Sequence, residues 1–269
     1  MNIERIAVLR NVRRVWIIGA IMGEYSKLRH IHEKIEHCFE FGDKIIYTGN
    51  YFGPEGDGLG VIKELLEFRC WALASGPFMH CDDVVFLSGR FEQMWLRANN
   101  LHRIPDCGFV MSWMLANGFG GIVRSYGLDP HHAQEKANQG PNELAVWLKD
   151  FKSAIAHAPG HKDFIGALKW MALTSERNIL VVSSGLAPHL PLTAQAQFLW
   201  WTQAGFDSLK EPYRSFKLVV RGYDKYADDK TNMMIDSCKL SLDSGSGRGG
   251  RLSAVCLDYQ GHMQHQFSL

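Results

Sequence analysis

Four polar residues that could bind a ligand follow short apolar runs of the sequence. Asn50, Arg90, Ser183 and Tyr223 each stand at or just after the end of such a run. A guanidinium group such as that of Arg90 can hold a phosphate or a carboxylate through two parallel hydrogen bonds. Asn50 offers a neutral amide oxygen, and un-ionised hydroxyl groups such as those of Ser183 and Tyr223 are poor metal ligands. These residue types suit an anion better than a metal ion.

The elements that would position these residues alternate between strand and helix patterns, as in βαβ units. Expected strands are Val15 to Gly19, Lys44 to Thr48 and Val84 to Leu87; expected helices are Glu24 to Phe39, Leu59 to Leu73 and a helix that begins with Phe91 to Arg97. Each strand ends at a glycine, Gly19, Gly49 or Gly89. The loops that follow therefore lie at the carboxyl edge of the sheet, where open α/β sheets bind their ligands.

The pattern changes in the middle of the chain. From about residue 105 to residue 176 the sequence predicts helices without strands, rich in Trp, Met and His. Strands are expected to resume at Ile179 to Val182, Lys217 to Val220, about Met233 to Leu242, and Leu252 to Leu257. The apolar faces of the helices and the pair Trp200–Trp201 are interpreted as core.

Six stretches, taken in order and with their spacing, carry a family resemblance. They are Val15 to Gly23, Ile45 to Gly56, Val85 to Glu92, Leu180 to Gly185, Leu218 to Asp224 and Leu242 to Asp258. The chain resembles the calcineurin-like metallophosphatases, and most of all the bacterial serine/threonine protein phosphatases and symmetric diadenosine-tetraphosphatases. The loops of that family read G-D-x-H-G, G-D-x-x-D-R-G, G-N-H-E, a lone His after a strand and G-H after another.

The resemblance implies a fold and a set of cofactors. The expected fold is a four-layer α/β/β/α sandwich, formed by residues 1–269 as a single domain with a helical cap insertion at about 105–176. Members of the family use two divalent metals such as Mn, Fe or Zn. At the positions of the family's metal ligands and catalytic groups this sequence has Ala20, Met22, Asn50, Gly53, Pro54, Arg90, Phe91, Ser183 and Tyr223.

These residues do not suit a dinuclear metal centre. Two dications held ~3.5–4 Å apart need anionic or imidazole ligands, and Ala20 and Met22 offer no hard donor. Asn50 lacks the charge of a bridging carboxylate, and Arg90 would place a cation beside the metals. The family's general acid is replaced by Phe91. We therefore expect no bound metal and no catalytic residue: a pseudophosphatase with a regulatory or scaffolding role that binds a protein partner.

Two alternatives remain open from the sequence. The first is a metal-dependent phosphatase or phosphoesterase with relocated ligands, drawn from Asp57, His80, Asp82, Asp83, Asp224 and Asp243. The second is a metal-free binder of a phosphorylated ligand, held by Arg90 and Arg221. Against this second alternative, we expect Arg90 to pair with a neighbouring carboxylate, that of Asp57 or Glu92.

The loop glycines carry a further expectation. Gly19, Gly23, Gly49 and Gly89 stand where the family also has glycine, which suggests that the loop backbone is retained while the side chains have changed. On this hypothesis, restoring all nine side chains together would restore metal binding.

Composition narrows the class of protein. The net charge is +1, from 29 basic and 28 acidic residues among 269, so neither nucleic acid nor an anionic membrane is an expected partner. The six cysteines are scattered and include no C-x-x-C pair, which is typical of reduced thiols in a cytoplasmic protein. We find no signal peptide in the sequence and no apolar run of the ~20 residues that a membrane span needs.

Other apparent motifs are weak. Residues 245–250 match G-x-G-x-x-G, but a strand and not a helix is expected after them, which argues against a dinucleotide site. His30 and His32 would lie on opposite faces of their helix and so could not share a metal. His262 and His265 are interpreted as surface residues of a tail.

Overall fold

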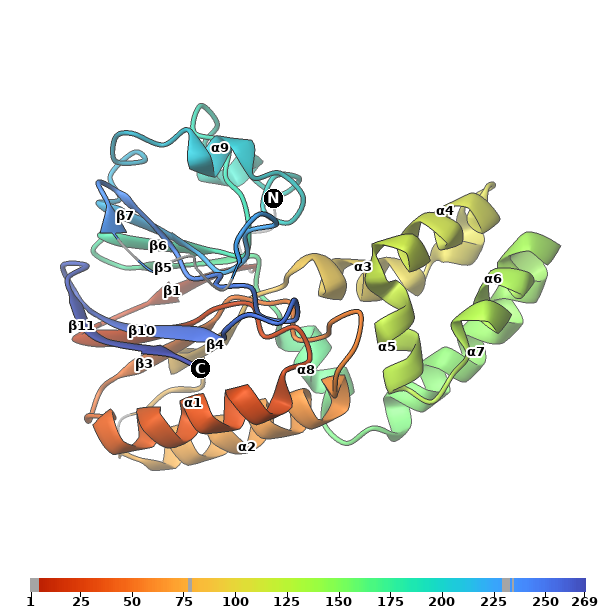
Figure 1. Cartoon of the computed structure of the whole chain (residues 1–269), viewed down its shortest axis with the longest axis horizontal. Helices are drawn as coiled ribbons and strands as arrows, with labels where there is room; N and C mark the ends of the chain where they lie inside the picture. The colour runs from red at the N-terminus through yellow and green to blue at the C-terminus, as the bar shows by residue number, and fades with distance from the viewer. Residues whose placement is uncertain (1–4, 77–78, 229–232, 234) are drawn as a thin grey trace.

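The computed structural model describes residues 5–76, 79–228, 233 and 235–269. In this part of the chain, two β-sheets pack face to face, with helices on the outside and a helical arm at one side (Figure 1). The architecture is the expected four-layer α/β/β/α arrangement. Its outer layers are unequal, because a pair of long helices covers one sheet, whereas mostly loop and short helices cover the other.

The first sheet is built from strands that the sequence predicts well, except for the edge strand β11. Its order is β11-β10-β2-β3-β4, in which β2, β3 and β4 are parallel and β10 runs antiparallel to β2. Every residue of β2 and β3 is buried, which explains why both are continuous apolar runs after their first residues, Arg14 and Lys44. The bounds are β2 Arg14–Ile18, β3 Lys44–Tyr47, β4 Val84–Phe86, β10 Ser253–Asp258 and β11 Met263–Ser268.

The second sheet has the order β1-β5-β6-β7-β9-β8. Its bounds are β1 Ile6–Leu9, β5 Met171–Thr174, β6 Ile179–Val182, β7 Leu218–Arg221, β8 Ile235–Asp236 and β9 Lys239–Ser241. The expected strand from Met233 to Leu242 is in fact two short strands, because Ser237 adopts a positive φ of 54° and reverses the chain into a hairpin.

Three apolar cores hold the layers together. Side chains such as Ile17, Ile46, Val181 and Val220 fill the space between the two sheets. The opposite face of the first sheet packs against α1 (Tyr25–Cys38) and α2 (Gly58–Ala74). The outer face of the second sheet is covered by the segment that contains η5 (Leu192–Ala194) and α9 (Ala204–Asp207).

The helical insertion is shorter than expected. It begins after α3 (Arg90–Ala98) and η3 (Leu101–Arg103), and it ends at Ala167 and not near residue 176. Its helices are α4 Cys107–Met114, η4 Leu115–Phe119, α5 Gly120–Ser125, α6 Pro130–Gln139, α7 Pro141–His157 and α8 His161–Ala167. The sequence prediction extended too far because β5, only four residues long, lies directly after this helical segment.

Two other strands were missed at the ends of the chain. β1 lies among arginines in the N-terminal segment, where four residues give too little pattern to recognise. β11 was interpreted as a tail, but its residues alternate between lower and higher exposure as those of an edge strand do. His265 belongs to this strand and stacks on the ring of Trp16, with 5.6 Å between the ring centroids.

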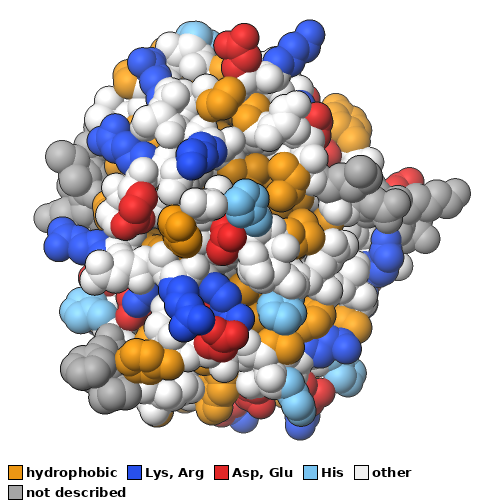
Figure 2. Space-filling model, turned by 90° about the vertical axis from the view of Figure 1, so that its left-hand side faces the viewer, with side chains coloured by type: hydrophobic (Ala, Val, Ile, Leu, Met, Phe, Trp, Pro, Cys, Tyr) orange, Lys and Arg blue, Asp and Glu red, His pale blue; other side chains and the backbone are white. Residues whose placement is uncertain are grey.

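The helices, the cysteines and the surface charges can be compared with what the composition indicates. The described helices include none that is long and apolar enough to cross a membrane. All six cysteines are free thiols; Cys107, Cys238 and Cys256 are buried, whereas Cys70 and Cys81 are exposed. Figure 2 shows basic and acidic side chains interspersed over the end of the molecule that faces away from the helical arm.

Candidate functional site

The residues that the sequence aligned with metal ligands meet at the carboxyl ends of strands from both sheets. They lie on five segments that follow strands, residues 19–23, 49–54, 88–91, 183–184 and 222–224, which we call the loop cluster; Arg90 and Phe91 begin helix α3. Backbone hydrogen bonds join these loops. Ala20 N donates to Gly222 O at 3.1 Å, Met22 N to Asn50 O at 2.6 Å and Tyr223 N to Ser183 O at 2.8 Å. The expected convergence is therefore present.

Glu92 binds the backbone of two of these loops. Its fully buried carboxylate accepts hydrogen bonds from Asn50 N at 2.8 Å, Tyr51 N at 2.9 Å and Gly89 N at 2.8 Å. Burial raises the pKa of Glu92, while the three backbone donors oppose that rise. The expectation that Glu92 pairs with Arg90 is wrong, because its oxygens are directed at the backbone.

Arg90 has no carboxylate partner among the described residues. Asp57, the other expected partner, caps α2 by accepting from Gly60 N at 2.8 Å. The Arg90 guanidinium instead lies 5.0 Å from the ring centroid of Phe91 and 5.5 Å from that of Tyr223. Its Nε is buried and forms no hydrogen bond to a described residue. The result is an unpaired cation held between two aromatic rings.

Two further polar atoms of the loop cluster are buried without a hydrogen-bond partner in the described chain. They are Asn50 Nδ2 and Ser183 Oγ. Asn50 Oδ1 faces Phe91 N at 3.4 Å, and the residue adopts a positive φ of 56°, which asparagine tolerates better than most residues. Buried polar groups usually have a partner, so these atoms mark a place where a polar ligand would gain hydrogen bonds.

Backbone from neighbouring segments fills the space beside Gly53. A Cβ added to Gly53 would clash with the carbonyl oxygen of Met22 and lie 2.9 Å from Glu55 O. The helical insertion closes the other side, since Gly121 packs directly on Gly53 O, and Arg124 donates to Pro54 O at 2.7 Å. Gly53 therefore cannot take a side chain without a backbone shift.

The Arg221 guanidinium is paired with two carboxylates. Its guanidinium pairs with Asp207 at 2.8 Å and with Asp224, and it lies 4.3 Å from the ring centroid of Phe206 on the outer face of the second sheet. With both carboxylates in place, its charge is already balanced. Of the two arginines considered for phosphate binding, only Arg90 remains free of a carboxylate.

The six residues considered as relocated ligands are not brought together. Asp224 pairs with Arg221, and buried Asp243 accepts from Arg248 at 3.0 Å and from Asp224 N at 2.9 Å. Burial raises the pKa of Asp243, while the Arg248 guanidinium opposes that rise. Both carboxylates are thus engaged in holding loops.

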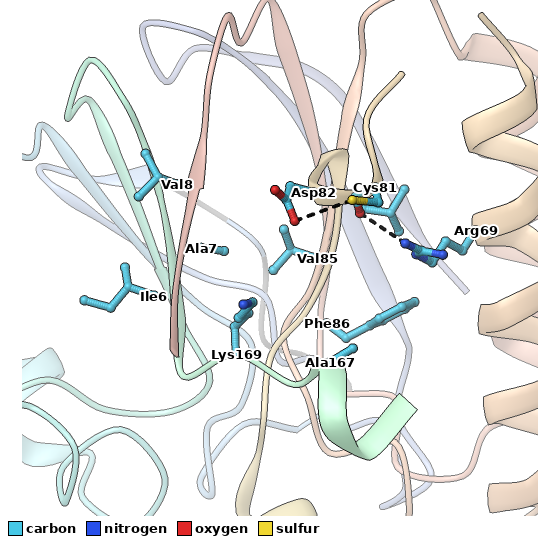
Figure 3. A pocket seen from close by; sticks show the side chains of 11 residues that line it. Ile6, Ala7, Val8, Arg69, Cys81, Asp82, Val85, Phe86, Ala167 and Lys169 are labelled. Atoms are coloured by element: carbon cyan, nitrogen blue, oxygen red, sulfur yellow. Dashed lines mark hydrogen bonds between the residues drawn. The ribbon is translucent and has the colours of Figure 1, made fainter. Parts of the chain in front are cut away.

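Three of the other relocated candidates, His80, Asp82 and Asp83, lie at the opposite end of the strands, whereas Asp57 caps α2. Asp83 pairs with Lys44 at 2.7 Å, and His80 and Asp82 are exposed beside η2 (Cys81–Asp83). Figure 3 shows Asp82 and Cys81 at the rim of a cavity between β1 and β4, where Arg69 donates to Cys81 O at 3.2 Å. His80, Cys81 and Asp82 form the one group of metal-ligand type found among the described residues, and it lies on the surface.

The donors of the loop cluster do not fit a pair of divalent metals. The cluster offers a thioether, an amide, a hydroxyl and a phenol, with no carboxylate or imidazole at the aligned positions. The single unpaired charge at these positions is the positive charge of Arg90, which repels a dication. The arrangement can bind an anion through the Arg90 guanidinium.

A cavity of about 430 Å³ opens beside Arg90. Arg90, Tyr223, Lys225 and Tyr226 contribute to its wall, together with Trp200 and Trp201 from the segment that covers the second sheet. The same segment contributes one carboxylate, that of Asp207, which pairs with Arg221 at 2.8 Å. The combination of two basic side chains with aromatic rings suits an anionic group carried on an apolar or aromatic body.

Solved structures of other proteins share this architecture. A protein assigned as a diadenosine tetraphosphatase superposes with a TM-score of 0.56 at 16% identity, over 98% of this chain and 97% of that chain. A cold-active protein tyrosine phosphatase superposes with a TM-score of 0.57 at 13% identity, over 99% of this chain and 82% of that chain. A Saccharomyces cerevisiae serine/threonine phosphatase superposes with a TM-score of 0.51 at 11% identity, over 95% of this chain and 77% of that chain.

The chain has the fold of the calcineurin-like metallophosphatases. No family model and no curated protein matches the sequence. At these identities the metallophosphatase fold is shared, and activity does not follow from it.

Two residues beside the loop cluster, Arg248 and Trp201, were not identified from the sequence. Arg248 lies 5.4 Å from the ring centroid of Tyr223, and Trp201 lines the cavity beside Arg90. Neither could be located without the fold, because each comes from a loop distant in sequence. The role of Glu92 could have been recognised from the sequence. A glutamate three residues after the N-cap residue, here Gly89, has the spacing of a capping box.

Proposed function

We propose that this chain is a pseudophosphatase: a metallophosphatase fold that does not hydrolyse phosphate esters and acts by binding a protein partner in the cytoplasm. The observation that carries the proposal is Arg90, an unpaired guanidinium in the place of a metal ligand. The changes at Ala20, Met22, Ser183 and Tyr223 support it. Each of these residues has neither a carboxylate nor an imidazole, the ligands that a pair of divalent metals needs, so the chemistry that two metals would supply lacks suitable residues to hold it.

We expect the purified protein to contain no stoichiometric manganese, iron or zinc and to leave an aryl phosphate unhydrolysed. Elemental analysis after purification without added metal tests the first point, and p-nitrophenyl phosphate with and without added Mn²⁺ tests the second. EDTA should leave the melting temperature unchanged, because no metal contributes to folding. Two equivalents of metal per chain, or turnover above that of a heat-denatured sample, would contradict the proposal.

A second candidate function is the binding of a phosphorylated ligand without metal. The specific observation in its favour is that Arg90 has no ion pair in the described chain and borders a cavity with Lys225 and aromatic walls. A guanidinium can hold a phosphate in a bidentate manner without any metal. The ligand would be a phosphorylated small molecule or a phosphopeptide.

Phenyl phosphate is a suitable probe for this second function. We expect saturable binding by calorimetry, weakened about tenfold or more in Arg90→Ala, since a charge-assisted bidentate contact is lost. Arg90→Lys should recover part of the affinity, because it retains the charge and loses the fork. Arg29→Ala, which removes an exposed arginine of α1, is the matched control and should bind as the wild type does. Absence of saturable binding by the wild type would rule this function out.

A further inference from the structure

A groove between α3 and the first helix of the helical insertion is lined by large apolar side chains that remain exposed. It lies between α3 and α4 and has a volume of about 860 Å³. Phe109 is 69% exposed, Trp113 42% and Ile104 39%. The apolar faces of these helices were expected to be core, and for this face of α4 the expectation is wrong. Clustered exposed aromatic residues of this kind mark interaction surfaces.

We propose that this groove binds an amphipathic, acidic helix of a partner protein. The inference rests on the proposed function, because it names the surface and the chemistry through which a non-catalytic protein would bind its partner. It concerns the helical arm and none of the residues of the loop cluster.

The shape of the groove favours a helix. Phe109 and Trp113 stand four residues apart on α4, as do Val110 and Met114, so they form two rows along the helix axis. The groove between two helices accepts the ridge of a third. An extended peptide would need hydrogen-bond partners for its backbone, and the apolar wall offers few. A helix satisfies its own backbone groups.

The charge of the rim favours an acidic partner. Arg97 and Arg103 border the groove, and neither makes an ion pair with a described residue. Among the described residues that line the groove, none carries a carboxylate. A second copy of this chain would bring the same arginines against themselves in a two-fold interface, which is unfavourable.

The groove also leads toward the cavity beside Arg90. Trp113, in its wall, contacts Trp201 at 5.4 Å between ring centroids, and Trp201 lines that cavity. Asn117, which donates from Nδ2 to Trp113 O at 2.8 Å, lines the cavity as well. Figure 1 shows α4 on the arm, clear of both sheets, so a partner could reach the groove without displacing the sandwich.

A displayed library of helix-forming peptides, panned against the full chain, tests the proposal. We expect enriched sequences to have leucine, isoleucine or phenylalanine at spacings of three and four, with glutamate or aspartate on the flanks. A synthetic peptide of the enriched sequence should bind Phe109→Ala about tenfold more weakly, as the loss of a central aromatic anchor predicts. Arg103→Glu should weaken binding as well, and added salt should reduce affinity for the wild type.

Phe41→Ala, which truncates a phenylalanine that is 56% exposed after α1, is the matched control and should bind normally. Circular dichroism should show that every variant is folded, since Phe109 and Arg103 are exposed. Enrichment of basic or extended sequences would overturn the proposal, as would binding unaffected by Phe109→Ala or failure to enrich any peptide. A dimer in solution that Phe109→Ala abolishes would also overturn it. None of these outcomes depends on metal content or hydrolysis, so the two proposals fail separately.

Discussion

Gly53→Ala is expected to lower the free energy of unfolding by on the order of 3 kcal/mol, because overpacking against rigid backbone cannot be relieved by a rotamer change. The added methyl group would meet the Met22 carbonyl on one side and lie 2.9 Å from Glu55 O on the other. Gly121 presses on the same loop from the helical insertion. The measurement is the urea concentration at the midpoint of unfolding, with the slope compared between variants.

Gly166→Ala is the matched control for this substitution. Gly166 lies in α8, and a Cβ built there meets nothing within 4 Å. Alanine in place of a helical glycine should leave stability unchanged or raise it by up to ~1 kcal/mol. If Gly53→Ala proved as stable as Gly166→Ala, the loop backbone would have the space that the structure denies it.

The result bears on whether metal binding can be restored. The retained glycines suggested that only side chains had changed, so that nine reversions would suffice. Gly53→Asp is one of those nine, and it needs the same Cβ that the Met22 carbonyl excludes. The backbone around Gly53 therefore leaves no room for the side chain that this reversion would add. Side-chain reversion alone is expected to fail unless the segment from Tyr51 to Gly56 is replaced as well.

The elements that the sequence predicted well are those with a continuous physical signal. β6 is apolar throughout, and β2 and β3 are apolar after their first residues, Arg14 and Lys44, because both faces of each strand are buried. Helices α1 and α2 cover a sheet and carry the corresponding apolar stripe. β1 and β5 are four residues long and pair with each other across more than 160 residues of sequence. Because the partner strand is so distant in the sequence, no local sequence pattern indicates the pairing.

The candidate site likewise has one part that the sequence predicts and one part that it does not. That the loops of Ala20, Asn50, Arg90 and Ser183 meet could be predicted, because parallel strands share a carboxyl edge. What each side chain contacts could not be predicted, since it depends on competition between neighbours. Arg90 was expected to pair with Glu92, but three backbone N–H groups hold that carboxylate, and the guanidinium lies beside Phe91 and Tyr223 instead.

The second large effect is expected from Glu92→Ala. The substitution leaves three buried N–H groups without an acceptor, those of Asn50, Tyr51 and Gly89. Each unsatisfied buried donor costs about 1–3 kcal/mol, so the loss in the free energy of unfolding should be about 3 kcal/mol or more. Because the same bonds join the loops after β3 and β4, Arg90 should also lose its fixed position between the two aromatic rings.

Two further variants separate this role of Glu92 from a general effect of losing a glutamate. Glu67→Ala removes an exposed carboxylate on α2, 3.8 Å from Lys63, and should change stability by less than ~0.5 kcal/mol. Glu92→Gln retains one acceptor oxygen but directs an amide donor toward backbone donors, so its loss should lie between those of the other two variants. Urea unfolding gives all three values. If Glu92→Ala proved no more destabilising than Glu67→Ala, these loops would be held by their surrounding apolar contacts, and the Glu92 carboxylate would not be what fixes them.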